Sequence, residues 1–240
     1  MPRDWIILVI MTRFESIKNF WKTCTASQTG PWIDRLRAGE LDVCHYQGFL
    51  LETYHNTRYN PQLQAYTTMF IPNNPHATVK RFYQHSISEI GHDQLALDDL
   101  MALGVDRAFV ESSKPQPITT AFFANAIWGI QTKGPAYFLG YLFHLEFNPT
   151  ENGKKYIEML TSKGIPENAL TFLEEHSTVD VAHNKFMEEY VRELVKTDAD
   201  EAIVCEAIAA SVDLHNRVLA SAFENGERVF GQRLKKSASF

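Results

Sequence analysis

Apolar side chains recur at helical spacing along almost the whole chain, and the alternation typical of strands is scarce. The pattern predicts a first helix within residues 4–26, followed by helices at 31–38, 41–70 and 76–103. After a connector at 114–117 it predicts two helices within 118–147, divided at Gly134-Pro135, and further helices at 150–162, 166–196 and 198–230. The sequence therefore predicts one all-α domain over residues 1–240, with its core at about 31–230, built as a multi-helix bundle of about eight helices.

Composition and charge exclude several classes of protein. The chain has 240 residues, 45% of them hydrophobic, so it can bury a large core, and 23 basic against 29 acidic residues give a net charge of -6 without a basic block. This argues against nucleic-acid binding. Cys24, Cys44 and Cys205 form no Cys-x-x-Cys pair, which favours a reducing, cytoplasmic environment. The apolar run at 5–11 is too short to span a membrane and lacks the features of a signal peptide, so we interpret it as part of a buried first helix.

Two segments repeat one pattern of metal-ligand residues: His, three residues, an acid, two residues, His. They are His85-Glu89-His92 and His176-Asp180-His183, which lie 91 residues apart. On a helix these positions share one face, and the rest of each face is apolar. Composition alone predicts about 0.04 such patterns in the chain. A buried carboxylate is costly without positive charge nearby, so a divalent metal ion is the favoured interpretation, and a hydrogen-bonded core network is the alternative.

Two other residues join as weaker ligand candidates. Glu146 ends one of the most apolar predicted helices, and the 91-residue offset places it opposite His55. Because those two helices otherwise match loosely, His55 is a second-tier candidate. Ordinary structural or surface roles are expected for the remaining histidines, His45, His76, His144 and His215.

Together these residues resemble a known family. Glu89-x-x-His92, Glu146 and the second segment are similar to the ligand motifs of the haem-oxygenase-like di-iron oxidases and oxygenases, and the resemblance covers about residues 40–225. This fold is shared with thiaminase-II-like (TenA-like) proteins, pyrroloquinoline-quinone-synthase-like proteins and haem oxygenases. The resemblance implies six metal ligands: Glu89, His92, Glu146, His176, Asp180 and His183. His85 departs from the family pattern, stands one turn before Glu89, and is a second-tier ligand that puts the division of ligands between two metal positions in doubt.

The resemblance also implies a reaction. It predicts an oxidase or oxygenase with two Fe(II) ions per chain, or Mn, that uses O2 to oxidise a small hydrophobic metabolite. Mixed imidazole and carboxylate ligands without thiolates suit these metals. Glu89, His92 and His85 are expected to be the catalytic residues. Aromatic residues are expected to line the substrate pocket, with core packing as the alternative role for each: Tyr54, Phe123, Tyr137 and Tyr141.

Four other functions remain open at this point. A metal-free thiaminase-like or quinone-synthase-like enzyme would use His85, Glu89 and His176 as acid–base groups, and a small-molecule-binding protein would use the same pocket without turnover. Haem oxygenase itself is a weaker option, because no histidine is marked as a haem ligand. A ferritin-like site built on Glu52-x-x-His55 and Glu89-x-x-His92 would leave the second segment unexplained. The sequence predicts no membrane partner and leaves a homodimer as an option.

Overall fold

The computed structural model describes residues 11–231, apart from the side chains of residues 178–184. These residues form eleven α-helices and two single turns of 3-10 helix, without a strand, which confirms the predicted all-α class. The helices are α1 Arg13–Ala26, α2 Pro31–Arg37, α3 Val43–Thr57, α4 Asn60–Thr67, α5 His76–Ser88, α6 His92–Ala102, α7 Arg107–Ser112, α8 Pro117–Lys133, α9 Pro135–Ser162, α10 Thr171–Leu194 and α11 Asp198–Val229. The 3-10 turns are η1 Thr68–Phe70 and η2 Glu167–Ala169.

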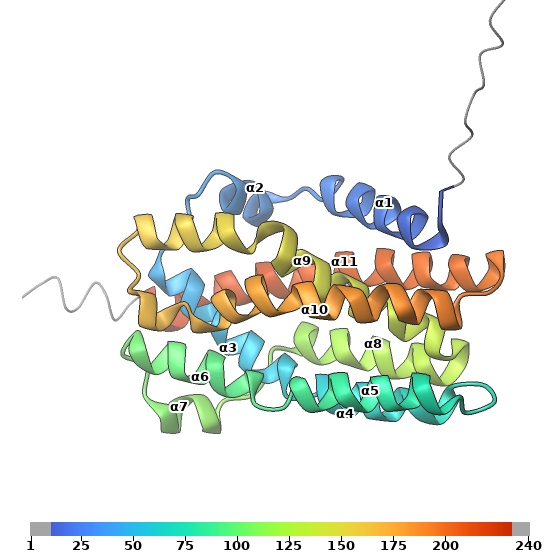
Figure 1. Cartoon of the computed structure of the whole chain (residues 1–240). Helices are drawn as coiled ribbons and strands as arrows, with labels where there is room; N and C mark the ends of the chain where they lie inside the picture. Colours follow the sequence, from blue (N-terminus) through green and yellow to red (C-terminus); the bar gives the residue numbers. More distant parts are fainter. Residues whose placement is uncertain (1–10, 232–240) are drawn as a thin grey trace, which may run out of the picture.

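Three long helices form the middle of the bundle. The helix α9 packs against both α10 and α11, and Figure 1 shows α1 and α2 above these three helices and α4 to α8 below them. The helix α3 packs against both α11 and α6. None of the helices in the described part of the chain combines the length and the hydropathy needed to cross a bilayer.

Two predicted helices are interrupted, because glycine and turn positions end them early. The segment 41–70 divides after Thr57 into α3 and α4, and the segment 76–103 divides between α5 and α6. The second break is set by Gly91, whose φ of 100° lies in the left-handed region, where only glycine is unstrained. The prediction that His85, Glu89 and His92 share one continuous helix is therefore wrong.

The helix α9 shows the opposite discrepancy. The sequence predicted one helix up to residue 147 and another at 150–162, but α9 continues through Pro149 and bends about half-way along (Figure 1). Proline removes one backbone hydrogen bond and bends a helix, and packing on α10 and α11 holds the rest together. Glu146 consequently lies inside a helix, not at its end.

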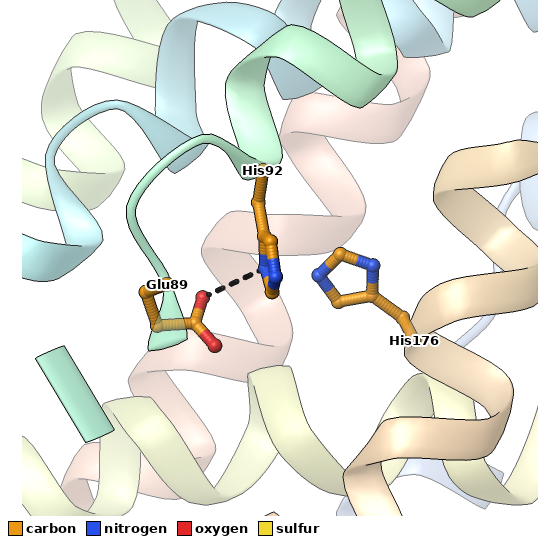
Figure 2. A group of neighbouring side chains, drawn as sticks. All are labelled: Glu89, His92 and His176. Carbon is orange, nitrogen blue, oxygen red and sulfur yellow. Dashed lines mark ion pairs between the residues drawn. The ribbon is translucent and has the colours of Figure 1, made fainter. Parts of the chain in front are cut away.

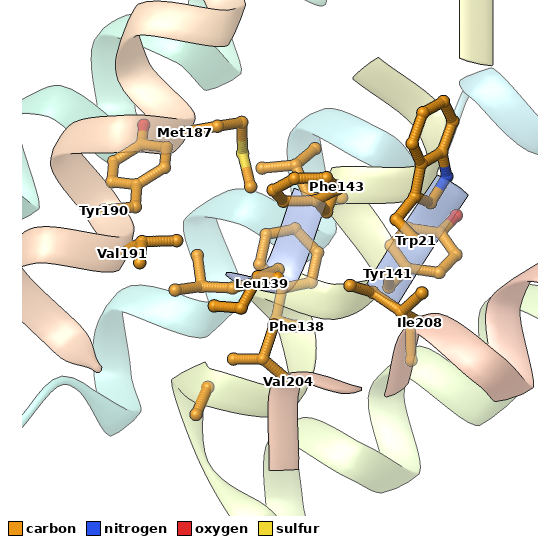
Figure 3. Close-up of a cluster of buried hydrophobic side chains, with 14 of the residues drawn as sticks. Trp21, Phe138, Leu139, Tyr141, Phe143, Met187, Tyr190, Val191, Val204 and Ile208 are labelled. Atoms are coloured by element: carbon orange, nitrogen blue, oxygen red, sulfur yellow. The ribbon is translucent and has the colours of Figure 1, made fainter. Parts of the chain in front are cut away.

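Aromatic side chains dominate the core between α1, α9, α10 and α11 (Figure 3). Trp21, Phe138, Phe143 and Tyr190 each expose 2% of their surface or less, and the rings of Phe143 and Phe147 stack with centroids 4.2 Å apart. Most of the apolar segment 118–147 thus packs the core. This is the alternative role that the sequence left open for its aromatic residues.

The helices α3 and α11 touch backbone to backbone at two glycines. A Cβ atom at Gly48 would lie 2.1 Å from the carbonyl oxygen of Ala222, and one at Gly226 would lie 2.2 Å from that of Cys44. Backbone atoms cannot move aside without separating the helices. The close contact therefore requires glycine at both positions.

We expect Gly48→Ala to lower the free energy of unfolding by about 3 kcal/mol, because the added methyl group forces α3 away from α11. Urea unfolding measures this loss. Gly231→Ala is the matched control, since its Cβ would meet only the Cys44 sulfur at 4.0 Å, and it should unfold like the wild type. Equal stability of the two variants would contradict the close packing.

Candidate metal centre

Five side chains of ligand type meet where α5, α6, α9 and α10 approach one another. They form two groups, in each of which one ligand atom per residue lies within 4.8 Å of the others. The first group contains Glu89, His92 and His176, which point toward one another in Figure 2. The second contains His85, Glu89 and Glu146. The structure therefore brings the first predicted segment, His176 of the second segment, and Glu146 to one place.

Glu89 belongs to both groups. It directly follows the last residue of α5, and the Gly91 turn then directs the chain into α6, so that His92 returns beside it. Its Oε2 lies 3.3 Å from His92 Nδ1, and its Oε1 lies 3.9 Å from His85 Nε2. The two oxygens of one carboxylate thus face different groups, so Glu89 could contribute a ligand to each.

In the first group, the protonation of His176 suits a metal ligand. Its Nδ1 lies 2.7 Å from the Phe172 carbonyl oxygen, which can only accept, so Nδ1 carries the proton and Nε2 keeps its lone pair. Burial, followed by the neighbouring His92, lowers the pKa of His176, which favours the neutral imidazole. The His92 and His176 ring centroids are 4.6 Å apart. Two imidazoles and a carboxylate therefore meet in a form that can bind a cation.

The second group is more deeply buried. His85 is fully buried, Glu89 and Glu146 expose 6% and 5% of their surface, and His85 Nε2 lies 3.1 Å from Glu146 Oε1. Two carboxylates this close in a buried site repel each other unless positive charge lies between them. The oxygen and nitrogen donors of both groups, without a thiolate, fit iron or manganese.

A cavity of about 580 Å³ reaches this centre and extends beneath α1 and α2. Glu89, Glu146 and His176 lie in its lining, which is mostly apolar and includes Phe122 and Phe172. A substrate in this cavity would lie directly against the metal ligands.

The four aromatic residues predicted for the substrate pocket are absent from this lining. Tyr54 is buried in the core, and Phe123 stacks on Tyr59 with ring centroids 4.3 Å apart. Tyr137 donates a hydrogen bond to Asn125, and Tyr141 donates one to Asn60, which does line the cavity. The helical spacing of these four residues indicated that they are buried. It could not show whether they face the cavity or the core, because both kinds of position recur with the same periodicity.

The other four ligand candidates have different outcomes. His55 lies outside both groups, where its Nε2 is 2.8 Å from Ser113 Oγ. The side chains of Asp180 and His183 lie outside the described residues, and their backbone forms part of α10. His85, in contrast, joins the second group.

Two histidines for which the sequence predicted ordinary roles also line the cavity, and a buried aspartate supports the start of α10. His144 and His215 line the cavity and contact each other, and Trp21 donates a hydrogen bond to His144. Asp99 is fully buried and accepts hydrogen bonds at the beginning of α10. The one sequence signal for Asp99 is an acid among the apolar positions Leu97 and Leu100. The pairing of His144 with His215, which lie 71 residues apart, has no signal in the sequence.

Buried histidines make stability depend on pH. Burial lowers the pKa of both His55 and His215 from 6.5 to about 4. Between these values the unfolded chain binds protons that the folded chain does not, so stability falls as the pH drops from about 6.5 toward 4. We expect His55→Gln to reduce the loss between pH 7 and pH 5 by about 1.5 kcal/mol in urea unfolding. His76→Gln, at an exposed histidine, is the control, and equal losses in both variants would contradict the assignment.

The comparisons with known proteins agree with this geometry. The sequence profile of a family described as iron-containing redox enzymes matches residues 47–216. The chain belongs to this family. No curated protein matches it.

Solved structures place this chain in the haem-oxygenase-like fold. A domain of unknown function with a haem-oxygenase-like fold from Shewanella denitrificans OS217 is 26% identical, with a TM-score of 0.77, over 88% of this chain and 90% of that one. A TenA homologue from Pyrococcus furiosus is 11% identical, with a TM-score of 0.68, over 88% of this chain and 97% of that one. The second likeness shows the fold alone.

Proposed function

We propose that the protein is a non-haem, di-iron oxidase or oxygenase that acts on a small, largely apolar metabolite in the cavity beside Glu89, Glu146 and His176. The observation that carries the proposal is the position of Glu89, whose two oxygens face two separate groups of ligands. The family description supports iron. The three cysteines are free thiols, which favours a reducing, cytoplasmic environment.

The chain's own residues prepare the site for this chemistry. Iron bound there would supply the electrons that reduce O2. Glu89, His92 and His176 would hold one ion, and His85, Glu89 and Glu146 would hold the other. The Phe172 carbonyl fixes the ring of His176, while the apolar lining of the cavity excludes water and favours an apolar substrate.

Oxygen consumption on addition of Fe(II) tests the proposal. We expect the wild type to consume O2 faster than Fe(II) alone, and Glu146→Gln to lose most of this activity because it removes a ligand of one group. Glu158→Gln changes an exposed glutamate on the same helix and should behave like the wild type. Consumption by Glu146→Gln at the wild-type rate would contradict the proposal.

The likeness to a TenA homologue is compatible with one alternative, a metal-free enzyme of the same fold. In it, His85, Glu89 and His176 would transfer protons on a bound ring. Once a substrate is known, full turnover after exhaustive chelation would support this alternative, and complete loss of turnover would exclude it.

A further inference from the structure

Three rings from three helices form a hydrogen-bonded row beside the cavity. Trp21 of α1 places its Nε1 3.1 Å from His144 Nδ1 on α9, and His144 Nε2 lies 2.9 Å from His215 Nδ1 on α11. All three residues line the cavity. Trp21 and His144 expose only 2% and 3% of their surface. None of the three belongs to the two groups of metal ligands.

The order of donors and acceptors in this row is fixed by the tryptophan. An indole N–H can only donate, so His144 Nδ1 accepts and carries no proton. The proton of His144 therefore lies on Nε2 and is donated to His215 Nδ1. In turn, His215 carries its own proton on Nε2. The row thus selects one tautomer of each histidine.

This leaves an N–H donor at the His215 end of the row. Nδ1 and Nε2 lie on opposite sides of an imidazole ring, so His215 Nε2 points away from His144. Among the described residues it has no hydrogen-bond partner, and Nδ2 of the neighbouring Asn216 is buried without one. Asn216 also lines the cavity. Two adjacent side chains of α11 therefore offer donors that no described residue accepts.

The surroundings of His215 make such a donor selective. Its ring stacks on Phe122 with centroids 5.7 Å apart, and Val212, one turn earlier on α11, lines the same cavity. A hydrogen bond in apolar surroundings is stronger than in water, and an unsatisfied partner there is costly. A ligand with an oxygen acceptor is favoured at this position over one that presents only donors.

We propose that His215, with Asn216 beside it, is the subsite that binds a carbonyl or carboxylate oxygen of the substrate. Trp21 and His144 are positioning residues that hold His215 in its donor tautomer. The inference rests on the proposed function only in taking the cavity as the substrate site. A substrate held here by its oxygen acceptor has the rest of its length available to reach Glu89, Glu146 and His176 in the same cavity.

Binding of three small probes to the metal-free full chain tests the proposal without iron chemistry. Hexanoate and 2-hexanone offer a carboxylate and a neutral carbonyl, and hexylamine offers only donors at neutral pH. Because Lys22, Arg37 and Lys155 also line the cavity and attract anions, the diagnostic quantity is the change in Kd caused by His215→Phe. We expect His215→Phe to weaken the binding of at least one of the two oxygen-containing probes about ten-fold and to leave the binding of hexylamine unchanged. The probe that responds shows whether the natural acceptor is a carboxylate or a carbonyl.

A conservative variant and a spectroscopic readout separate recognition from a structural role. His215→Gln keeps an N–H donor and should recover most of the affinity that His215→Phe loses. Nitrogen NMR of the wild type should show the proton of His215 on Nε2, and Trp21→Phe should release this preference. Equal weakening of all three probes in His215→Phe, no weakening of either oxygen probe, or a proton on Nδ1 in the wild type would overturn the proposal. Because the protein is metal-free in these measurements, failure here would leave the di-iron proposal standing.

Discussion

Glu89→Ala is expected to abolish iron binding at both positions, because Glu89 is the one residue that both groups of ligands share. Loss of a direct ligand should weaken each position by more than about 100-fold, since even an outer partner of a ligand contributes about 10- to 100-fold. Glu146→Ala and His176→Ala each touch a single group, so each should keep about half of the bound iron. Iron content after anaerobic Fe(II) loading and desalting measures all three variants.

The control for this series is the same substitution at a glutamate outside the site. Glu158→Ala removes an exposed glutamate from α9 and should keep the wild-type iron content. If Glu89→Ala retains as much iron as Glu146→Ala, the shared role of Glu89 is wrong.

Glu146→Gln should stabilise the metal-free protein, although it removes a ligand of the proposed iron site. In the metal-free protein Glu89 and Glu146 lie close together in a buried site, so Glu146→Gln removes a repulsion and should raise the free energy of unfolding by about 1 kcal/mol. With iron bound, the same variant should be less stable than the wild type, because it has lost a ligand. Urea unfolding with and without Fe(II) measures both signs. The same sign in both conditions would point to an ordinary hydrogen-bonded network.

Asp99→Ala is expected to destabilise the protein by about 3 kcal/mol and to weaken metal binding at a distance. Asp99 on α6 is fully buried and accepts three hydrogen bonds at the start of α10, from the Thr171 backbone and hydroxyl and from the Phe172 backbone. The truncation leaves these donors without their acceptor and removes a negative charge from a helix N-terminus. Since the Phe172 carbonyl orients His176, iron affinity should fall as well.

The neighbouring aspartate provides a matched control. Asp98 has a side chain that is 64% exposed and lies 3.8 Å from Arg107, so Asp98→Ala should cost less than about 0.5 kcal/mol. Urea unfolding gives the two losses, and hydrogen exchange should show faster opening of the first turns of α10 in Asp99→Ala alone. Equal stability of the two variants would remove Asp99 from this role.

Much of the fold could be predicted from the sequence because helical periodicity reports buried faces. The second segment, from His176 onward, lies within one helix as predicted, and Gly134-Pro135 separates α8 from α9 as predicted. Breaks inside periodic segments could not be placed. A lone glycine such as Gly91 fits either a helix interior or a left-handed cap, and only the packing of α6 decides between them.

The candidate site was predictable where ligands recur at a fixed spacing, and unpredictable where contacts join distant helices. Glu89, His92, Glu146 and His176 were named from the sequence, and the structure brings them together. The membership of His85 in the second group depends on its distance to Glu146, 61 residues later, which no local pattern reports. The four aromatic residues predicted to line the substrate pocket do not line the cavity, for a different reason. In sequence, a buried aromatic residue that faces a cavity has the same spacing as one that packs on another ring.

Anomalous X-ray scattering from crystals of the protein loaded anaerobically with Fe(II) tests whether Glu89 is shared by two iron ions. We expect two iron peaks on either side of Glu89, one beside His92 and His176 and the other beside His85 and Glu146. A single peak, or none at these side chains, would contradict the shared carboxylate on which the proposed function rests.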